Sequence, residues 1–285
     1  MIVVTGASGH LGRLVVQGLL EKVPAGQIVA AVRSPEKAAD LAERGVTVRE
    51  ADYNEPETLT SALDGADKVL LVSGTEFGKR VRQHQAVVEA AQKAGVGHLV
   101  YTSAPKADTS KLILAPEHKA TEEIIRFSGL TYTLLRNGWY NENYQPTIEQ
   151  AVRMGGFIGS AGDGRVSSAA RADYAAAAVA VLTGEGHENK IYELSGDVAW
   201  TYADFAAEIG KVAGKEIAYT DLSPEQHKAT LTEAGLPEET VNFVVALDAN
   251  IKEGELAGTS DELHALIGRA TTPIATTIAE IVTEI

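Results

Sequence analysis

The first half of the chain alternates short apolar runs with amphipathic stretches, and little linker separates them. The apolar runs predict strands at 2–5, 28–32, 46–50, 68–73, 98–102 and 131–135. Apolar residues at helical spacing predict helices near 10–22, 35–44, 56–63, 82–95 and 117–128. Alternating strands and helices, with strands that are apolar almost throughout, are typical of a parallel sheet covered on both faces. We therefore expect an α/β fold with a Rossmann-type, doubly wound parallel sheet.

The pattern changes after about residue 136. Glycines at 155–156 and 162–164 are turn signals, and the second group is expected to join short strands at 157–160 and 165–169. Later segments predict a strand at 191–194 and helices near 172–183, 202–213, 224–234, 238–253 and 260–268. We expect residues 1–150 to form the Rossmann domain, with strand 191–194 returning to its sheet. Residues 151–285 then form a smaller, α-rich lobe on the substrate side of a cleft.

Three glycines at three-residue intervals follow the first predicted strand: Gly6, Gly9 and Gly12. Gly6 can take a tight turn, Gly9 lets the backbone approach a pyrophosphate, and Gly12 lets the next helix pack close to the strand. The helix N-terminus offers free N–H groups and the positive end of its dipole to an anion. The order of strand, glycine turn and helix predicts a dinucleotide site, with a purely structural glycine turn as the alternative.

The second predicted strand ends about 20 residues beyond the glycines, where dinucleotide sites distinguish NAD from NADP. An acidic residue there binds the ribose 2′-hydroxyl of NAD, whereas an arginine accommodates the 2′-phosphate of NADP. The chain has Arg33 and no carboxylate at 32–34, which favours NADP(H). An arginine that only caps the strand in solvent is the alternative.

Two loops after predicted strands carry further candidates. The 74–80 loop has one residue too few between its glycines for a P-loop, and Arg80 stands where Ser or Thr must ligate Mg²⁺, so we expect no kinase or ATPase. This loop either lies against a cofactor or is a solvated turn. In the 136–144 segment, asparagines can bond a nicotinamide carboxamide, and Trp139, Tyr140 and Tyr144 can form a flat wall for an aromatic substrate. Alternatively, these aromatic residues hold the two lobes together.

Composition narrows the function classes. The net charge is −14, and residues 201–285 hold 15 acidic and 5 basic residues, which argues against a nucleic-acid partner. The absence of cysteine excludes disulfides, zinc–thiolate sites and a thiol nucleophile, and the seven histidines show no metal-ligand spacing. The longest apolar run, 174–182, is too short for a bilayer span, and no leader precedes the first strand. We expect a cytoplasmic protein without a metal or a membrane partner; nothing in the sequence indicates its oligomeric state.

Several motifs together carry a family resemblance. They are Thr-Gly-Ala-Ser-Gly-His-Leu-Gly at 5–12, Val-Arg at 32–33, Ala-Asp-Tyr at 51–53, Tyr-Thr-Leu-Leu-Arg-Asn-Gly-Trp-Tyr at 132–140 and Arg-Ala-Asp-Tyr-Ala at 171–175. With them the chain resembles the NmrA-like atypical short-chain dehydrogenases/reductases. Within that family it is most similar to the branch of bacterial NADPH:quinone oxidoreductases (type 2) and triphenylmethane reductases. The likeness extends over nearly the whole chain, including 186–190 and 266–268.

The resemblance implies a Rossmann domain with a small α-rich lobe, NADPH as hydride donor, and quinones or other conjugated electrophiles as acceptors. It also implies cofactor contacts at three places besides Arg33. These are the glycine loop (Gly6, Ala7, Ser8, Gly9, His10 and Leu11), the second loop (Phe77, Gly78 and Lys79) and the segment after the sixth strand (Asn137, Gly138, Trp139, Tyr140, Asn141 and Glu142).

One departure from the wider superfamily affects the mechanism. Its dehydrogenases use Tyr-x-x-x-Lys after the fifth strand, whereas here Ala115 stands four residues before Lys119. Without the tyrosine, a tyrosine-driven alcohol dehydrogenase or an extended-type epimerase or ketoreductase is disfavoured, and Lys119 is interpreted as a surface residue. His118 and Tyr140 remain weak catalytic candidates; His118 could protonate a reduced product near neutral pH.

The missing acid suits quinones better than ketones, because a quinone that accepts hydride becomes a stable anion that can take its proton from water. Our hypothesis is direct hydride transfer from NADPH, without flavin, to a ring stacked beside Tyr140 and Trp139. A different class of function remains open. NmrA, which gives the family its name, is a regulator that binds dinucleotide without turnover, so a redox sensor is the alternative.

Overall fold

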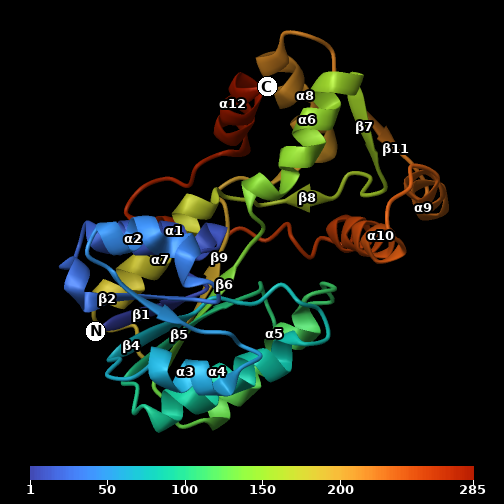
Figure 1. Cartoon of the computed structure of the whole chain (residues 1–285). Coiled ribbons are helices and arrows are strands. Elements are labelled where there is room, and N and C mark those ends of the chain that lie inside the picture. Colours follow the sequence, from blue (N-terminus) through green and yellow to red (C-terminus); the bar gives the residue numbers. More distant parts are fainter.

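The computed structural model describes all residues from 1 to 285, and a seven-stranded sheet forms its centre (Figure 1). The strand order is β3-β2-β1-β4-β5-β6-β9, and every neighbouring pair is parallel. The strands are β1 (Ile2–Thr5), β2 (Ile28–Val32), β3 (Thr47–Glu50), β4 (Lys68–Leu71), β5 (His98–Ser103), β6 (Tyr132–Asn137) and β9 (Lys190–Leu194). The order reverses between β1 and β4, which places a crevice at the carboxyl ends of these strands. The predicted α/β, Rossmann-type doubly wound fold is confirmed.

Helices cover both faces of this sheet because successive strand residues point to opposite sides. Val3 of β1 packs in one core cluster and Val4 in the other. One face carries α1 (His10–Leu20), α2 (Ala39–Glu43), α7 (Arg171–Thr183) and α11 (Glu262–Ile267). The opposite face carries α3 (Pro56–Ala62), α4 (Arg80–Lys93) and α5 (Ala115–Phe127). Helices α7 and α11 thus pack on the main sheet although they follow residue 150, and β9 joins the sheet as expected for 191–194. The domain boundary at residue 150 stays a prediction.

The remaining elements form a second lobe with its own core (Figure 1). Its helices are α6 (Gln145–Met154), α8 (Tyr202–Ala213), α9 (Pro224–Glu233), α10 (Glu238–Lys252) and α12 (Ile274–Glu284). Aromatic side chains, among them Tyr144, Phe157, Trp200 and Phe205, pack at its centre with ring centroids 5.0–5.6 Å apart. Such aromatic clusters bury a large apolar area in a small lobe. None of the helices in the structure combines the length and apolar character needed to cross a membrane.

Two local predictions in this lobe differ from the structure. The strands expected at 157–160 and 165–169 are β7 (Gly156–Gly159) and the shorter β8 (Arg165–Val166), and they do not pair with each other. β7 pairs with β11 (Ala218–Asp221), and β8 pairs with β10 (Trp200–Thr201). The glycines between them serve another purpose, because a Cβ at Gly164 would lie 2.5 Å from the Ile251 carbonyl oxygen. The connection therefore allows close packing against α10.

The structure contains several short elements and two helices that the sequence did not predict. The helix expected at 35–44 divides into a 3₁₀ turn, η2 (Pro35–Ala38), and α2, and further 3₁₀ turns occur at η1 (Ala25–Gln27) and η3 (Asn141–Tyr144). Helices α6 and α12 were not predicted. A proline marks the start of each helix, Pro146 in the first turn of α6 and Pro273 directly before α12, which is a recognisable start signal.

Candidate functional site

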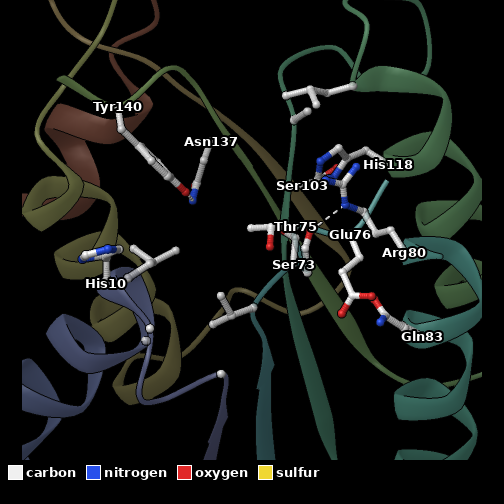
Figure 2. Close-up of a pocket in the computed structure, with 18 of the residues that line it drawn as sticks. His10, Ser73, Thr75, Glu76, Arg80, Gln83, Ser103, His118, Asn137 and Tyr140 are labelled. Carbon is white, nitrogen blue, oxygen red and sulfur yellow. Dashed lines mark hydrogen bonds between the residues drawn. The ribbon is translucent and has the colours of Figure 1, made fainter. Parts of the chain in front are cut away.

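A cleft of about 610 Å³ opens at the carboxyl ends of the sheet strands, where the second lobe faces the sheet. The glycine loop and Arg33 line one part of it, and residues of β5, β6, α4, α5 and α10 line the rest. Figure 2 shows His10 of the glycine loop on one side of this cleft and Arg80, Gln83 and His118 on the other. The cleft thus brings together residues from Gly6 to Phe243, in the crevice where ligands bind in doubly wound folds.

The glycine loop has the geometry of an anion site. Gly6 has a φ of +59°, in the left-handed region, and the Gly9 N–H donates to the Gly6 carbonyl at 2.9 Å. A Cβ at Gly12 would lie 2.4 Å from the Gly6 carbonyl oxygen, so only glycine allows this approach of α1. Gly9 caps α1 without a side-chain hydrogen bond, which leaves the first N–H groups of the helix for a ligand. All loop residues predicted as contacts line the cleft except Ala7, which is fully buried beneath it.

Arg33 also lines the cleft, and its side chain is 67% exposed. Its only ion pair is a long one, 4.0 Å to Glu76, which also pairs with Lys79 at 3.0 Å. Exposed pairs of this kind contribute at most about 1 kcal/mol. Arg33 is therefore free to exchange Glu76 for a stronger anion such as a phosphate.

Only one of the three candidates in the second loop lines the cleft. Phe77 does so, and its ring centroid is 5.7 Å from that of Phe243, which comes from α10 in the other lobe. Gly78 and Lys79 lie outside the lining. Gly78 has a φ of +75°, and its N–H donates to Glu117 of α5 at 2.8 Å, so this part of the loop is attached to the protein surface.

In the segment after β6, too, only some of the predicted contact residues line the cleft. Asn137, Gly138, Trp139 and Tyr140 line the cleft. Asn137 donates from Nδ2 to the Tyr140 hydroxyl at 3.3 Å, and the two side chains point toward one another (Figure 2). Its Oδ1 is buried without any hydrogen-bond partner, which is unusual in a folded protein. Asn137 as a residue lines the cleft, so its side-chain amide lies next to any ligand bound there.

Asn141, Glu142 and Tyr144 lie outside the cleft lining, because the chain turns into η3 directly after Tyr140. Asn141 donates to the Thr272 carbonyl and to Thr277, each at 3.1 Å. Glu142 accepts from the Arg171 N–H, at the start of α7, at 2.9 Å. Tyr144 packs in the second-lobe core and contributes nothing to an aromatic wall in the cleft; that expectation was wrong. These three side chains hold the segment in place.

His118 and Tyr140, the two weak catalytic candidates, both line the cleft. Burial, assisted by the nearby Arg80 guanidinium, lowers the pKa of His118 to about 3, so its imidazole is neutral near pH 7. Burial also raises the pKa of the Tyr140 hydroxyl above its ordinary value. Neither group is an acid poised near neutral pH. Lys119, next in sequence, is exposed on the outside of α5.

A buried network of charged side chains lies beneath the part of the cleft that β5 and β6 line. Arg136 binds Glu122 through two hydrogen bonds, Nε to Oε1 at 2.9 Å and Nη2 to Oε2 at 2.7 Å, and it also reaches Glu193 at 2.8 Å. Ser103, at the end of β5, donates its hydroxyl proton to Glu122 at 2.7 Å. The Ser103 hydroxyl can therefore accept a hydrogen bond from a ligand in the cleft but cannot donate one to it.

Sequence reasoning missed several residues of the acceptor side. Arg80 appeared only as a departure from a P-loop, yet its buried guanidinium donates to the Gly74 carbonyl and to Glu117, both at 2.7 Å, and fixes the second loop. Phe243 lies in a segment whose helical pattern gave no sign of a ligand. Other members of the lining missed in this way include Gln83, Ala104, Pro105, Leu112, Leu114 and Arg171. No cluster of three or more metal-ligating side chains occurs in the structure.

Comparison with known proteins gives a consistent result. The NAD(P)H-binding family matches residues 6–185. Quinone oxidoreductase 2 of Escherichia coli is 49% identical over 281 residues, covering 99% of this chain and 98% of the relative. The crystal structure of the NADPH-dependent quinone oxidoreductase from Escherichia coli complexed with NADPH has a TM-score of 0.96 at 48% identity, over 99% of this chain and all of that one. The Citrobacter triphenylmethane reductase complexed with NADP(H) has a TM-score of 0.94 at 42% identity, over 99% of this chain and all of that one.

Proposed function

Because this chain belongs to the NAD(P)H-binding family, we propose that it uses NADPH to reduce quinones or similar conjugated electrophiles by direct hydride transfer. One observation carries the proposal: a single cleft joins the glycine loop to a wall of aromatic side chains. The first part suits a dinucleotide, and the second suits a flat, conjugated ring. The similarity to a quinone oxidoreductase over almost the full length of both chains supports the same assignment.

The residues present fit the cofactor. Gly6, Gly9 and the start of α1 would hold the pyrophosphate, and Arg33 would pair with the 2′-phosphate that distinguishes NADPH from NADH. The side-chain amide of Asn137, which lines the cleft, would hydrogen-bond the carboxamide. Bound NADPH supplies the hydride and the reducing power, which is chemistry the side chains of the cleft do not have.

The chain's own contribution is to hold the acceptor flat beside the cofactor. Trp139 and Tyr140 directly after β6, with Phe77 and Phe243 from opposite lobes, offer aromatic surface to a ring. Ala115, which is buried, occupies the position of the tyrosine acid used by related dehydrogenases. A quinone that takes up one hydride becomes a hydroquinone monoanion, and one proton from water completes the hydroquinone. Positioning therefore suffices for the reaction.

The test is turnover by the purified chain with NADPH and with NADH, against a series of benzoquinones and triphenylmethane dyes. We expect NADPH oxidation with quinones, a preference for NADPH over NADH, and no visible absorption from a bound flavin. A yellow protein would contradict direct transfer. Tight NADPH binding without turnover of any acceptor would contradict the enzyme and favour a redox sensor.

A further inference from the structure

His118 presents one ring nitrogen to the protein and the other to the cleft. Its Nδ1 lies 2.7 Å from the Tyr101 hydroxyl, inside the sheet–helix interface. Its Nε2 has no hydrogen-bond partner in the protein. Only two side-chain atoms of the structure are both buried and unpartnered, Asn137 Oδ1 and the Tyr144 hydroxyl, so Nε2 retains some accessible surface. Since the residue lines the cleft, Nε2 is reached from there. A ligand in the cleft can therefore hydrogen-bond this atom.

The partner of Nδ1 determines which nitrogen carries the proton. Tyr101 is fully buried, and burial raises the pKa of its hydroxyl far above its ordinary value, so the hydroxyl keeps its proton. Nδ1 of His118, at 2.7 Å, is the only hydrogen-bond partner of the buried Tyr101 hydroxyl, so a proton not donated to this nitrogen would be left unpartnered in the core. We therefore assign Tyr101 as the donor, and a neutral imidazole that accepts at Nδ1 carries its own proton on Nε2. His84 next to it has the opposite tautomer, because its Nε2 accepts from the Gly74 N–H at 2.9 Å.

The surroundings keep His118 neutral. The titratable and charged groups packed around it are Arg80 and His84 of α4, Tyr101 of β5, and Glu117 of its own helix. Arg80 opposes a second positive charge, and Glu117 is already paired with Arg80 at 2.7 Å. An imidazolium is thus disfavoured near pH 7, and the ring acts as a neutral N–H donor.

We propose that the Nε2–H of His118 hydrogen-bonds the carbonyl oxygen of the acceptor, and that Tyr101 fixes the tautomer that makes this possible. The oxygen gains negative charge as hydride reaches the quinone, so the hydrogen bond strengthens toward the transition state. His118 keeps its proton, because passing it on would leave an unprotonated Tyr101 in the core. The final proton comes from water. Ser103 cannot take this role, since its hydroxyl proton is bound by Glu122. This inference rests on the proposed quinone reduction.

Acceptor chemistry provides the test. A benzoquinone develops charge on oxygen, whereas a triphenylmethane dye cation takes hydride at carbon and loses its positive charge without forming an oxyanion. We expect His118→Leu to lower kcat for benzoquinone by about tenfold or more, as for other donors to a developing oxyanion. Dye reduction should change less than about twofold, within the scatter of near-neutral substitutions. His118→Gln, whose amide N–H can replace Nε2–H, should recover most of the quinone activity.

Lys119→Ala is the matched control, because Lys119 is exposed on the same helix. Equal losses with quinone and dye in His118→Leu would show a structural role and overturn the inference. A wild-type protein that reduces no quinone would instead contradict the proposed function itself.

The tautomer can be measured without turnover. In protein labelled with ¹⁵N-histidine, long-range ¹H–¹⁵N correlation distinguishes Nε2–H from Nδ1–H. We expect Nε2–H for His118 in the wild type, loss of that preference in Tyr101→Phe, and a selective fall in quinone kcat in the same variant. Nδ1–H in the wild type would overturn the assignment whatever the kinetics show.

Discussion

The two halves of the cleft are built in different ways. The cofactor half comes mainly from the backbone of one continuous segment, 6–12, in which glycines create the space and the N–H groups face the ligand. The acceptor half comes from side chains on β5, β6, α5 and α10. The first and last of these elements are more than a hundred residues apart in the sequence. A backbone site depends on local conformation, whereas a side-chain site depends on how distant elements pack. Substitutions should therefore act differently in the two halves.

The largest effect is expected below the acceptor half, at Arg136. Arg136→Leu leaves Glu122, which is 3% exposed, buried without its main partner, and should lower the free energy of unfolding by about 3–5 kcal/mol. Denaturant unfolding measures this loss. Arg126→Leu is the control, because Arg126 is a partly exposed partner of the same carboxylate at 3.3 Å and should cost less than about 1 kcal/mol. Similar losses of unfolding free energy in both variants would show that the buried network of Arg136 and Glu122 does not stabilise this part of the cleft.

In the cofactor half, the largest effect is expected from one added methyl group. Gly12→Ala places a Cβ against backbone atoms of Gly6 and Ala7, which cannot move as side chains do, at a cost of about 1–3 kcal/mol. NADPH affinity should fall about tenfold or more, as measured by fluorescence titration, while quinone KM at saturating NADPH changes little. Gly26→Ala, where the new Cβ meets nothing within 4 Å, should leave affinity unchanged.

Cofactor choice is the next test. Arg33→Asp should lower kcat/KM for NADPH by about ten- to a hundredfold relative to NADH, because a charge-assisted hydrogen bond to phosphate contributes about 1.5–3 kcal/mol. Arg44→Asp makes the same charge change at an exposed position outside the cleft and should not alter the ratio. An equal loss with both cofactors would show that Arg33 does not contact the phosphate.

The smallest effect is expected where the lobes meet over the acceptor. Phe243→Ala removes the ring that faces Phe77 and should raise KM for aromatic acceptors about three- to tenfold, in line with about 1 kcal/mol for an aromatic pair. NADPH affinity should stay the same, which separates the two halves kinetically. Phe127→Ala is the control, since Phe127 is 89% exposed on α5. A fall in NADPH affinity would show that Phe243 belongs to the cofactor half.

The candidate site could be predicted only in part, and the reason is physical. The glycine loop was located because its conformation is encoded within seven residues. Asn141 and Glu142 share their segment with Asn137 and Trp139, yet they point away from the cleft because η3 turns the chain. Composition could not show that turn. Phe243 lies on a helix whose apolar residues gave no hint that one of them reaches the cleft.

The sequence by itself determined the sheet, its helices and the dinucleotide loop, because period-two and period-3.6 patterns and glycine spacing act over short distances. The extra lobe was expected from the change of pattern, although its strand pairs and two of its helices were not. Only the tertiary structure decided the acceptor site. It set Phe77 of one lobe against Phe243 of the other and buried Tyr101 beneath His118, so that one histidine nitrogen is held by the core and the other faces the cleft. Which nitrogen of an imidazole carries the proton depends on the groups next to the ring in space, and the spacing of residues along the chain does not show which groups those are.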